Sequence, residues 1–273
     1  MTKFFTHKIF SLIFILPLFS LAQIKYEAEA NEKITPVIKE IIHPLGDNRI
    51  TIQTFQYGDR KDIVFINLHD NESTAVNATQ KLLESAGGML IKIDNGSKRN
   101  ISFRVNGRSF IFDPNRIFSK KGIQLSLLRF GNSDNKAIQE IDVFAKKILE
   151  LIPQNVQCII ALHNNSNDNF SIKNYLPGKE NATDTKEINI DTRQDADDFF
   201  LTTDSLLFQQ LKTKNYNVVL QDNLKAKQDG SLSVYFGEKN KRYLNCETEH
   251  GKSKQYEEML KIAIQSLQEI KMN

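Results

Sequence analysis

Two short, continuous apolar runs stand out in the hydrophobic pattern of this chain. Residues 62–69 read DIVFINLH and residues 156–163 read VQCIIALH, so that each run ends at a histidine before a polar stretch. Runs of this length and composition are typical of strands that are buried on both faces of a sheet. Strand-like segments over residues 216–221 and 242–250 predict two further strands.

Segments with apolar residues at helical spacing alternate with these runs. The pattern predicts helices over residues 72–85, 135–152, 204–215 and 254–270. Gly87 and Gly88 follow the first of them as a stop signal, and Pro153 ends the second. Residues 164–198 are polar and lack clear periodicity, and we expect a long loop there. Strands that alternate with helices predict a single α/β domain, with a central mixed, largely parallel sheet flanked by helices.

Between the first two helices, Asn-Gly pairs separate three strand-like segments. The segments span residues 89–94, 100–105 and 108–113. Asn95-Gly96 lies between the first and the second, and Asn106-Gly107 between the second and the third. Because both residues of an Asn-Gly pair tolerate positive φ, we expect hairpin turns at these two places.

The first 22 residues have the parts of a secretory signal peptide. Lys3 and Lys8 form a basic start, residues 9–19 form an apolar core, and Ser20-Leu21-Ala22 forms a cleavage sequence. The apolar core is too short for a relaxed membrane span. We therefore expect cleavage after Ala22 and a secreted or periplasmic mature domain over residues 23–273, without membrane association once the signal is removed.

The charge balance argues against a nucleic-acid partner. The formal net charge of the chain is +3, and removing the two lysines of the signal segment lowers it to +1. Domains that bind nucleic acid show a concentrated basic stripe, and the sequence has none.

The two cysteines, Cys158 and Cys246, both lie in apolar strand-like runs. In an exported protein they could form one disulfide. Small buried thiols are also common near functional residues, and each cysteine lies a few positions from a candidate site residue. We therefore favour two free buried thiols, and no Cys-His signature marks either as a nucleophile.

Histidine and glutamate residues stand where the predicted strands end. His69 and Glu72 are three positions apart, across a strand end and a helix start, which places both side chains on one side. His163 ends another buried strand, and ligands in α/β sheets bind at the carboxyl ends of the strands. Hydrolytic zinc takes three protein ligands of this kind and keeps one open position. In the alternative interpretation, these histidines bond to the backbone and have only a structural role.

Further segments follow the His69-x-x-Glu72 pair in a characteristic order. They are Arg108 after an Asn-Gly turn, DPNRIF at residues 113–118, ALHNNSND at residues 161–168 and NCETEHG at residues 245–251. This order resembles the zinc carboxypeptidase superfamily, in particular its aspartoacylase and succinylglutamate desuccinylase branch. The resemblance covers roughly residues 60–265, although residues 165–240 match only in layout.

The resemblance implies a carboxypeptidase-like fold with zinc as the cofactor. It implies that His69, Glu72 and His163 bind the ion, and that a glutamate of CETEHG is the general base that takes a proton from water. Glu247 and Glu249 are both candidates for this base, since they face the same side of a strand. Glu247 lies nearer the body of the strand and fits the family better.

The resemblance also implies roles for an arginine and for an Asn-Arg pair. Arg108 matches the arginine that stabilises the tetrahedral oxyanion with fixed positive charge. Asn115 and Arg116 match the pair that grips a substrate carboxylate, which a planar guanidinium can do with two hydrogen bonds. Taken alone, Arg116 could instead be a surface arginine that pairs with Asp113, and Asn115 a turn residue after a proline.

Two further residues are candidates that no motif supports. Tyr235 is a possible counterpart of the tyrosine that digestive carboxypeptidases place over the substrate, although a structural strand tyrosine is the simpler expectation. Arg193, in the polar segment, could contact a carboxylate, although a solvated surface position is the default.

The sequence therefore predicts an exported zinc-dependent hydrolase that cleaves an amide or peptide bond next to a free carboxylate. Expected substrates are small peptides or acyl-amino acids, and the export signal favours peptides outside the cytoplasm, including cell-wall peptides. The alternative is a non-catalytic protein that binds peptides or glycans on a degenerate carboxypeptidase scaffold. The complete set of three ligands argues against that alternative.

Overall fold

Strands and helices alternate along most of the chain. The structure, a computed structural model, describes residues 33–166 and 170–272. The strands are β1 (Val37–Leu45), β2 (Asn48–Tyr57), β3 (Ile63–Asn67), β4 (Gly88–Asp94), β5 (Ile101–Val105), β6 (Arg108–Phe112), β7 (Cys158–Asn165), β8 (Thr185–Asn189), β9 (Phe199–Thr202), β10 (Val218–Gln221) and β11 (Tyr243–Glu249). The helices are α2 (Ser73–Ala86), α3 (Lys120–Arg129), α4 (Asn135–Glu150), α5 (Ser205–Thr213), α6 (Leu232–Glu238) and α7 (Ser253–Met272).

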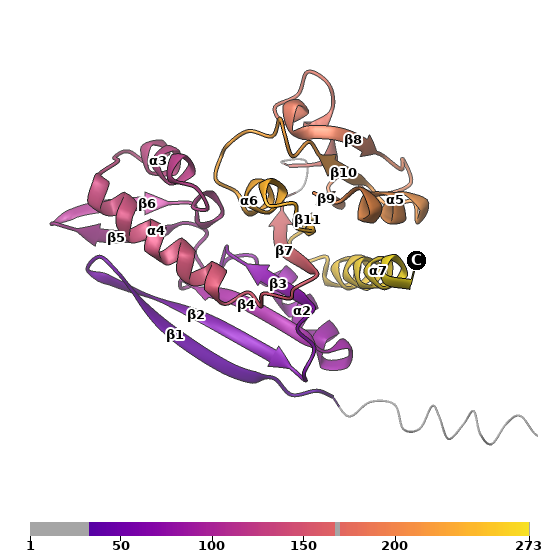
Figure 1. Ribbon diagram of the computed structural model, residues 1–273, viewed down its shortest axis with the longest axis horizontal. Helices are drawn as coiled ribbons and strands as arrows, with labels where there is room; N and C mark the ends of the chain where they lie inside the picture. Colours follow the sequence, from indigo (N-terminus) through magenta and orange to yellow (C-terminus); the bar gives the residue numbers. More distant parts are fainter. Residues whose placement is uncertain (1–32, 167–169, 273) are drawn as a thin grey trace, which may run out of the picture. The chain divides into compact units, whose positions relative to one another are not determined.

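Nine of the described strands form one sheet in the order β1-β2-β4-β3-β7-β11-β9-β10-β8, and β5 and β6 form a separate hairpin (Figure 1). The four central strands β4, β3, β7 and β11 run parallel, and antiparallel pairs lie towards both edges. The carboxyl ends of these central strands consequently meet at one edge of the sheet. The predicted α/β class and mixed sheet are confirmed.

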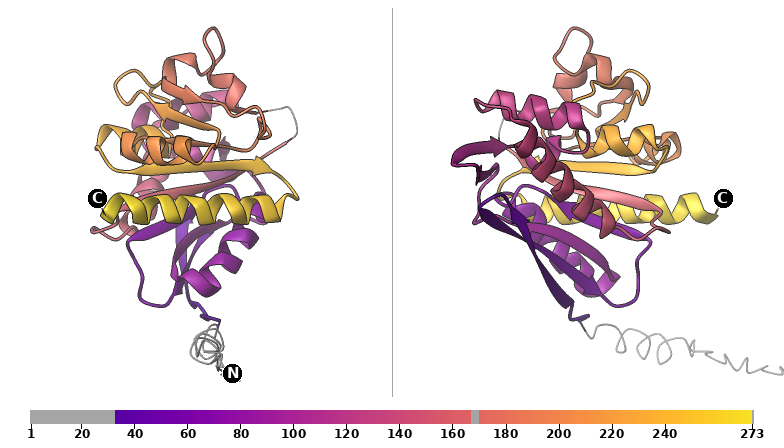
Figure 2. Two further views of the ribbon diagram at one scale, coloured as in Figure 1. Left: turned by 90° about the vertical axis from the view of Figure 1, so that its right-hand side faces the viewer. Right: turned by 60° about the vertical axis from the view of Figure 1, so that its left-hand side comes forward.

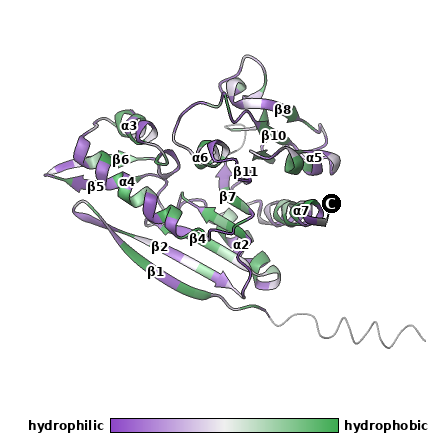
Figure 3. Ribbon diagram, viewed as in Figure 1, coloured by the Kyte–Doolittle hydropathy of each residue, from purple (hydrophilic) through white to green (hydrophobic). Residues whose placement is uncertain are grey.

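Helices cover both faces of this sheet. One buried cluster joins the sheet to α2, α5 and α7 and includes Phe65 and Tyr256. The other cluster joins it to α4 and the β5–β6 hairpin and includes Ile66 and Phe144. Phe65 and Ile66 are consecutive in β3 and serve opposite cores, because successive side chains of a strand point to opposite faces. Figure 2 shows α7 alongside β11, and Figure 3 shows hydrophobic and hydrophilic residues alternating along α4.

One of the two Asn-Gly predictions is confirmed and the other is wrong. Asn106 and Gly107 have φ values of 51° and 74° and join β5 to β6 as a hairpin. Asn95-Gly96 makes no hairpin, since β4 and β5 belong to different sheets. The reason is the carboxylate of Asp70, which accepts the backbone N–H groups of Asn95 (2.8 Å) and Ser97 (2.7 Å) and turns the chain away.

The structure differs from the sequence prediction at two further places. The predicted loop over 164–198 contains β8, a half-exposed edge strand whose mixed polarity hides its periodicity. Tyr235, expected in a strand, lies in α6, where its ring packs against Phe118 and Phe236. Cys158 and Cys246 are buried free thiols, as favoured from the sequence.

Two predictions from the sequence concern export and membrane association. The predicted signal segment over residues 1–22 and its expected cleavage after Ala22 lie outside the described residues. Among residues 33–166 and 170–272, no helix combines the length and the apolar character needed to span a membrane.

Candidate metal centre

The two histidines and the glutamate approach one another from neighbouring central strands. β3 ends at Asn67, and His69 and Glu72 lie in the connection that leads into α2. His163 lies in β7, which pairs with β3 in parallel, so both segments open onto the same edge of the sheet. All three side chains are buried, with exposed fractions of 1%, 1% and 5% for His69, Glu72 and His163.

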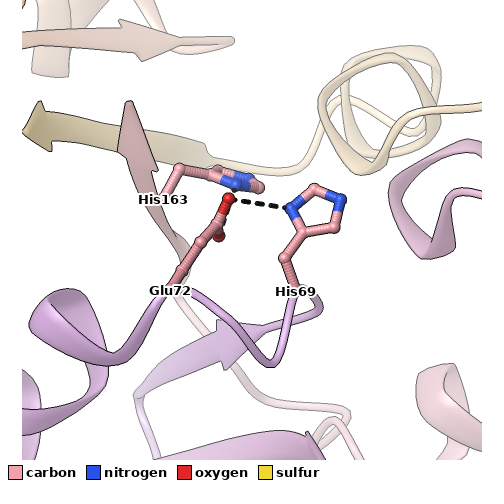
Figure 4. Close-up of side chains that lie close together, drawn as sticks. All are labelled: His69, Glu72 and His163. Carbon is pink, nitrogen blue, oxygen red and sulfur yellow. Dashed lines mark hydrogen bonds and ion pairs between the residues drawn. The ribbon is translucent and has the colours of Figure 1, made fainter. Parts of the chain in front are cut away.

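The carboxylate of Glu72 lies between the two imidazole rings (Figure 4). Its Oε1 atom is 3.0 Å from Nδ1 of His69, and its Oε2 atom is 3.1 Å from Nδ1 of His163. One potential ligand atom from each residue lies within 4.8 Å of the other two. The convergence expected from the sequence is therefore present, and the donor chemistry of two nitrogens and one carboxylate fits a metal ion such as zinc.

Asp113 holds His69 from the opposite side. Its Oδ1 atom lies 2.8 Å from Nε2 of His69 and also accepts the backbone N–H of Asn115 at 2.8 Å. A carboxylate on the outer nitrogen fixes the tautomer and orientation of a metal-binding histidine, so Nδ1 is left for the ion. This contact was not predicted from the sequence, which indicated Arg116 as the partner of Asp113, although the place of Asp113 in DPNR beside the other motifs was a usable signal.

Burial and neighbouring charges shift the pKa values of His69 and Glu72 in opposite directions. Burial alone would lower the pKa of His69, but the Glu72 and Asp113 carboxylates raise it to about 9. Burial by itself raises the pKa of Glu72, and the two histidines overcome this and bring the pKa far below its usual value. Charge-assisted hydrogen bonds thus connect Glu72 to His69 and His163.

Glu247 lies directly beside this cluster. β11 and β7 are parallel neighbours, and their register sets Glu247 opposite His163. Glu247 is 6% exposed and lines a cavity of about 480 Å³ together with Glu72 and His163. Burial raises the pKa of its carboxyl group, and the nearby His163 partly offsets that effect. Glu249 lies outside the cavity and pairs with Lys252 at 3.2 Å, so the geometry favours Glu247 over Glu249.

Of Arg99 and Arg108, it is Arg99 that lies at the cavity. Nη1 of Arg99 lies 2.7 Å from Oε1 of Glu72, and Arg99 lines the cavity. Arg108 lies outside the cavity at the start of β6, half-exposed, with Nη1 3.4 Å from the carboxylate of Asp134. Arg108 therefore does not lie at the site, where the sequence resemblance implied an arginine that stabilises the oxyanion. Asp70 explains the difference. Its carboxylate accepts the backbone N–H groups of Asn95 and Ser97, and these hydrogen bonds hold the segment in a position from which Arg99 reaches Glu72.

Asn115 and Arg116 both line the cavity. They form a short 3₁₀ turn after β6. Oδ1 of Asn115 accepts the backbone N–H of Leu232 at 3.2 Å, which leaves its amide nitrogen as the group to donate to a ligand. Nε of Arg116 lies 3.4 Å from the carboxylate of Asp229, and Nη1 donates to the backbone oxygen of Asn115 at 2.7 Å.

His250, which directly follows β11, also lines the cavity. The two remaining candidates do not reach it. Tyr235 lies outside the cavity, in α6. Arg193 is exposed on the surface and pairs with Asp191 at 2.8 Å, the default expected for it. Two tyrosines that the sequence analysis did not single out, Tyr175 and Tyr243, line the cavity instead.

Comparisons with known proteins give matches in structure only. No family model and no curated protein matches this chain. An aspartoacylase-family protein from Mesorhizobium loti is 13% identical, covers 86% of this chain and 68% of its own length, and has a TM-score of 0.43. A metallo-carboxypeptidase from Burkholderia cenocepacia is 8% identical, with coverages of 93% and 70% and a TM-score of 0.47. A murein-tripeptide amidase from Escherichia coli O157 is 8% identical, with coverages of 86% and 94% and a TM-score of 0.42.

All three similarities have TM-scores below 0.5 and therefore carry no argument about what this chain does.

Proposed function

We propose that the protein is a zinc-dependent hydrolase that cleaves an amide bond next to a free carboxylate. The observation that carries the proposal is the meeting of His69, Glu72 and His163 at one buried point beside Glu247. Two imidazoles and one carboxylate suit zinc and leave a coordination position open. When bound there, zinc supplies a Lewis acid that polarises a carbonyl and makes water acidic near neutral pH.

Glu247 is the proposed general base. Its carboxylate accepts the proton of the attacking water and then delivers it to the leaving amine. A group that both takes and gives a proton works best when its pKa is shifted towards the working pH, and burial of Glu247 raises its pKa in that direction.

Arg99, Asn115 and Arg116 are the proposed substrate contacts. The guanidinium of Arg99, beside Glu72, provides fixed positive charge where the carbonyl oxygen becomes negative. The free amide nitrogen of Asn115 and the guanidinium of Arg116 donate to the substrate carboxylate. Arg99 takes the role that the sequence resemblance implied for Arg108.

The signal segment at residues 1–22 supports export, and with it substrates outside the cytoplasm. We propose small peptides or acyl-amino acids as the substrate class, with cell-wall peptides among them.

Zinc content and turnover together test the proposal. The purified protein is expected to contain about one zinc per chain, measured by atomic emission, and to hydrolyse members of a panel of acyl-amino acids and short peptides. Zinc without turnover of any panel member would favour the alternative, a peptide- or glycan-binding protein on the same scaffold. Absence of zinc after loading would leave only structural histidines.

Asp113→Asn is expected to weaken zinc binding about 10–100-fold, because the change removes the carboxylate that orients His69. Competition with a chromophoric chelator measures the affinity. Asp134→Asn is the matched control, since it removes an equal charge at the start of α4, keeps a capping side chain and contacts none of the three ligands. Equal affinities of Asp113→Asn and the wild-type protein would contradict the orienting role.

A further inference from the structure

The hydroxyl group of Tyr256 contacts both β7 and β11, the two strands that carry His163 and Glu247. It donates a hydrogen bond to the backbone oxygen of Cys246 (2.9 Å) and accepts one from the backbone N–H of His163 (3.1 Å). Tyr256 belongs to the first turn of α7 and is completely buried. One side chain of α7 thus connects the backbones of the two strands beside the proposed metal centre.

The two backbone groups that Tyr256 contacts face each other in the hydrogen-bond ladder of the sheet. Hydrogen bonds between parallel strands recur with a period of two residues. At the start of the pair, the backbone N–H of Ile159 donates to the oxygen of Arg242 (3.1 Å). Four positions further along both segments, the same series assigns the N–H of His163 to the oxygen of Cys246. The hydroxyl therefore lies at the ladder position that joins β7 to β11 next to the proposed ligand and base.

Tyr256 approaches the sheet from the face opposite the cavity. It belongs to the buried cluster that joins the sheet to α2, α5 and α7, and Leu162 and Cys246 belong to the same cluster. His163 and Glu247 directly follow these two residues, so their side chains point to the other face, where the cavity lies. Tyr256 does not line the cavity. Its influence on the site therefore passes through the strand backbone.

The packing of α7 fixes the place of this hydroxyl. α7 packs against α2, and Nζ of Lys81 in α2 lies 2.8 Å from Oε1 of Glu257 in α7. Glu257 directly follows Tyr256, and α2 begins directly after Glu72. The helix that carries Tyr256 is therefore held against the helix that follows another of the proposed ligands.

A tyrosine hydroxyl suits this position because it is both a donor and an acceptor. It can hold an N–H group and a carbonyl oxygen at the same time, which a phenylalanine ring cannot do. The N–H group belongs to His163 itself, and the carbonyl of Cys246 belongs to the peptide bond that leads into Glu247. A shift of either group consequently moves the side chain that follows it into the site.

From these contacts we infer that Tyr256 is a positioning residue, which fixes the separation of His163 and Glu247 by holding their strands at one ladder position. A general base acts only within hydrogen-bond reach of the proton that it accepts, so its separation from the metal ligands sets the rate. The inference rests on the proposed function, since it concerns the ligand and the base of the same site.

Tyr256→Phe tests the inference in the metal-loaded protein. The substitution is expected to lower kcat about 10–100-fold, because the base and the metal ligand lose their fixed separation. KM is expected to change by no more than about threefold, since Tyr256 lies on the face away from the substrate. A second measurement requires no turnover. In the protein loaded with Co²⁺, whose visible absorption bands depend on the arrangement of the ligands, Tyr256→Phe is expected to shift these bands.

Tyr57→Phe is the matched control. Tyr57 is 3% exposed and belongs to the same buried cluster, but it lies in β2, which β4 and β3 separate from β7. Loss of this hydroxyl is expected to leave kcat and the Co²⁺ spectrum at their wild-type values. Thermal unfolding of both variants establishes that the kinetics and spectra are recorded on folded protein.

Three results would overturn the inference. The first is a Tyr256→Phe protein with wild-type kcat and a wild-type Co²⁺ spectrum. The second is an equal effect of Tyr57→Phe on both measurements. The third is a Tyr256→Phe protein that does not fold while Tyr57→Phe does, because Tyr256 would then support the sheet as a whole.

The outcomes for the two proposals remain separable. Equal turnover by the wild-type protein and by Tyr256→Phe, with equal spectra, would overturn the inference and leave the hydrolase proposal intact. A shifted Co²⁺ spectrum in Tyr256→Phe, for a protein whose wild type hydrolyses no member of the panel, would support the inference and count against the hydrolase.

Discussion

Glu247→Gln is expected to lower kcat for amide hydrolysis by about 10²–10⁴ and to leave the zinc content unchanged. Glutamine has nearly the same shape and can still accept the hydrogen bond from Asn245, but it cannot take a proton from water. Glu247 lies beside the three proposed ligands without being one of them, so the metal stays bound. Steady-state kinetics and metal analysis on the same preparation check both parts.

Glu249→Gln is the control for this substitution. It makes the same chemical change two residues away, in a side chain that lies outside the cavity and pairs with Lys252. Activity close to wild type is expected. If instead Glu249→Gln abolished hydrolysis while Glu247→Gln remained active, the base would have been assigned to the wrong residue.

Arg99→Ala is expected to lower kcat by about 10²–10³, the usual effect of removing one group that stabilises an oxyanion. The guanidinium of Arg99 lies 2.7 Å from Glu72 at the cavity wall. Because its contribution arises in the transition state, kcat is expected to fall much more than KM rises. Zinc content is the accompanying measurement, since loss of the metal would mimic the loss of rate.

Arg108→Ala tests whether Arg99, which lies at the cavity, or Arg108, which the sequence resemblance implied, stabilises the oxyanion. Arg108 is half-exposed and pairs with Asp134 at 3.4 Å, and exposed pairs of this kind contribute about 1 kcal/mol of stability or less. Turnover is expected to stay near wild type. A large loss of activity in Arg108→Ala, with Arg99→Ala unaffected, would mean that the hairpin arginine acts on the substrate after all.

The approach of His69, Glu72 and His163 to one another could be predicted because local sequence patterns mark their positions. His69 and Glu72 lie at a strand-to-helix boundary that an apolar run and a helical repeat both mark, and His163 lies near the end of an equally clear run. Buried parallel strands have strongly apolar sequences, so their ends are visible without any knowledge of the partners.

The arginine could not be predicted in this way. Whether Arg99 or Arg108 reaches the cavity depends on the path of the chain after β4, and that path depends on hydrogen bonds from Asn95 and Ser97 to Asp70, about 25 residues earlier. An Asn-Gly pair indicates only that a tight turn is allowed. It does not indicate which strand follows the turn in the sheet.

The sequence by itself determined the α/β class, the central strands and the three proposed metal ligands, because periodicity and strand ends are local properties of the chain. The tertiary structure agreed with the choice of Glu247 over Glu249, and it alone placed Arg99 rather than Arg108 at the cavity and brought Asp113 onto His69. Those choices depend on strand register and on side-chain contacts between distant segments. Such contacts form only when the chain packs, so no local pattern records them.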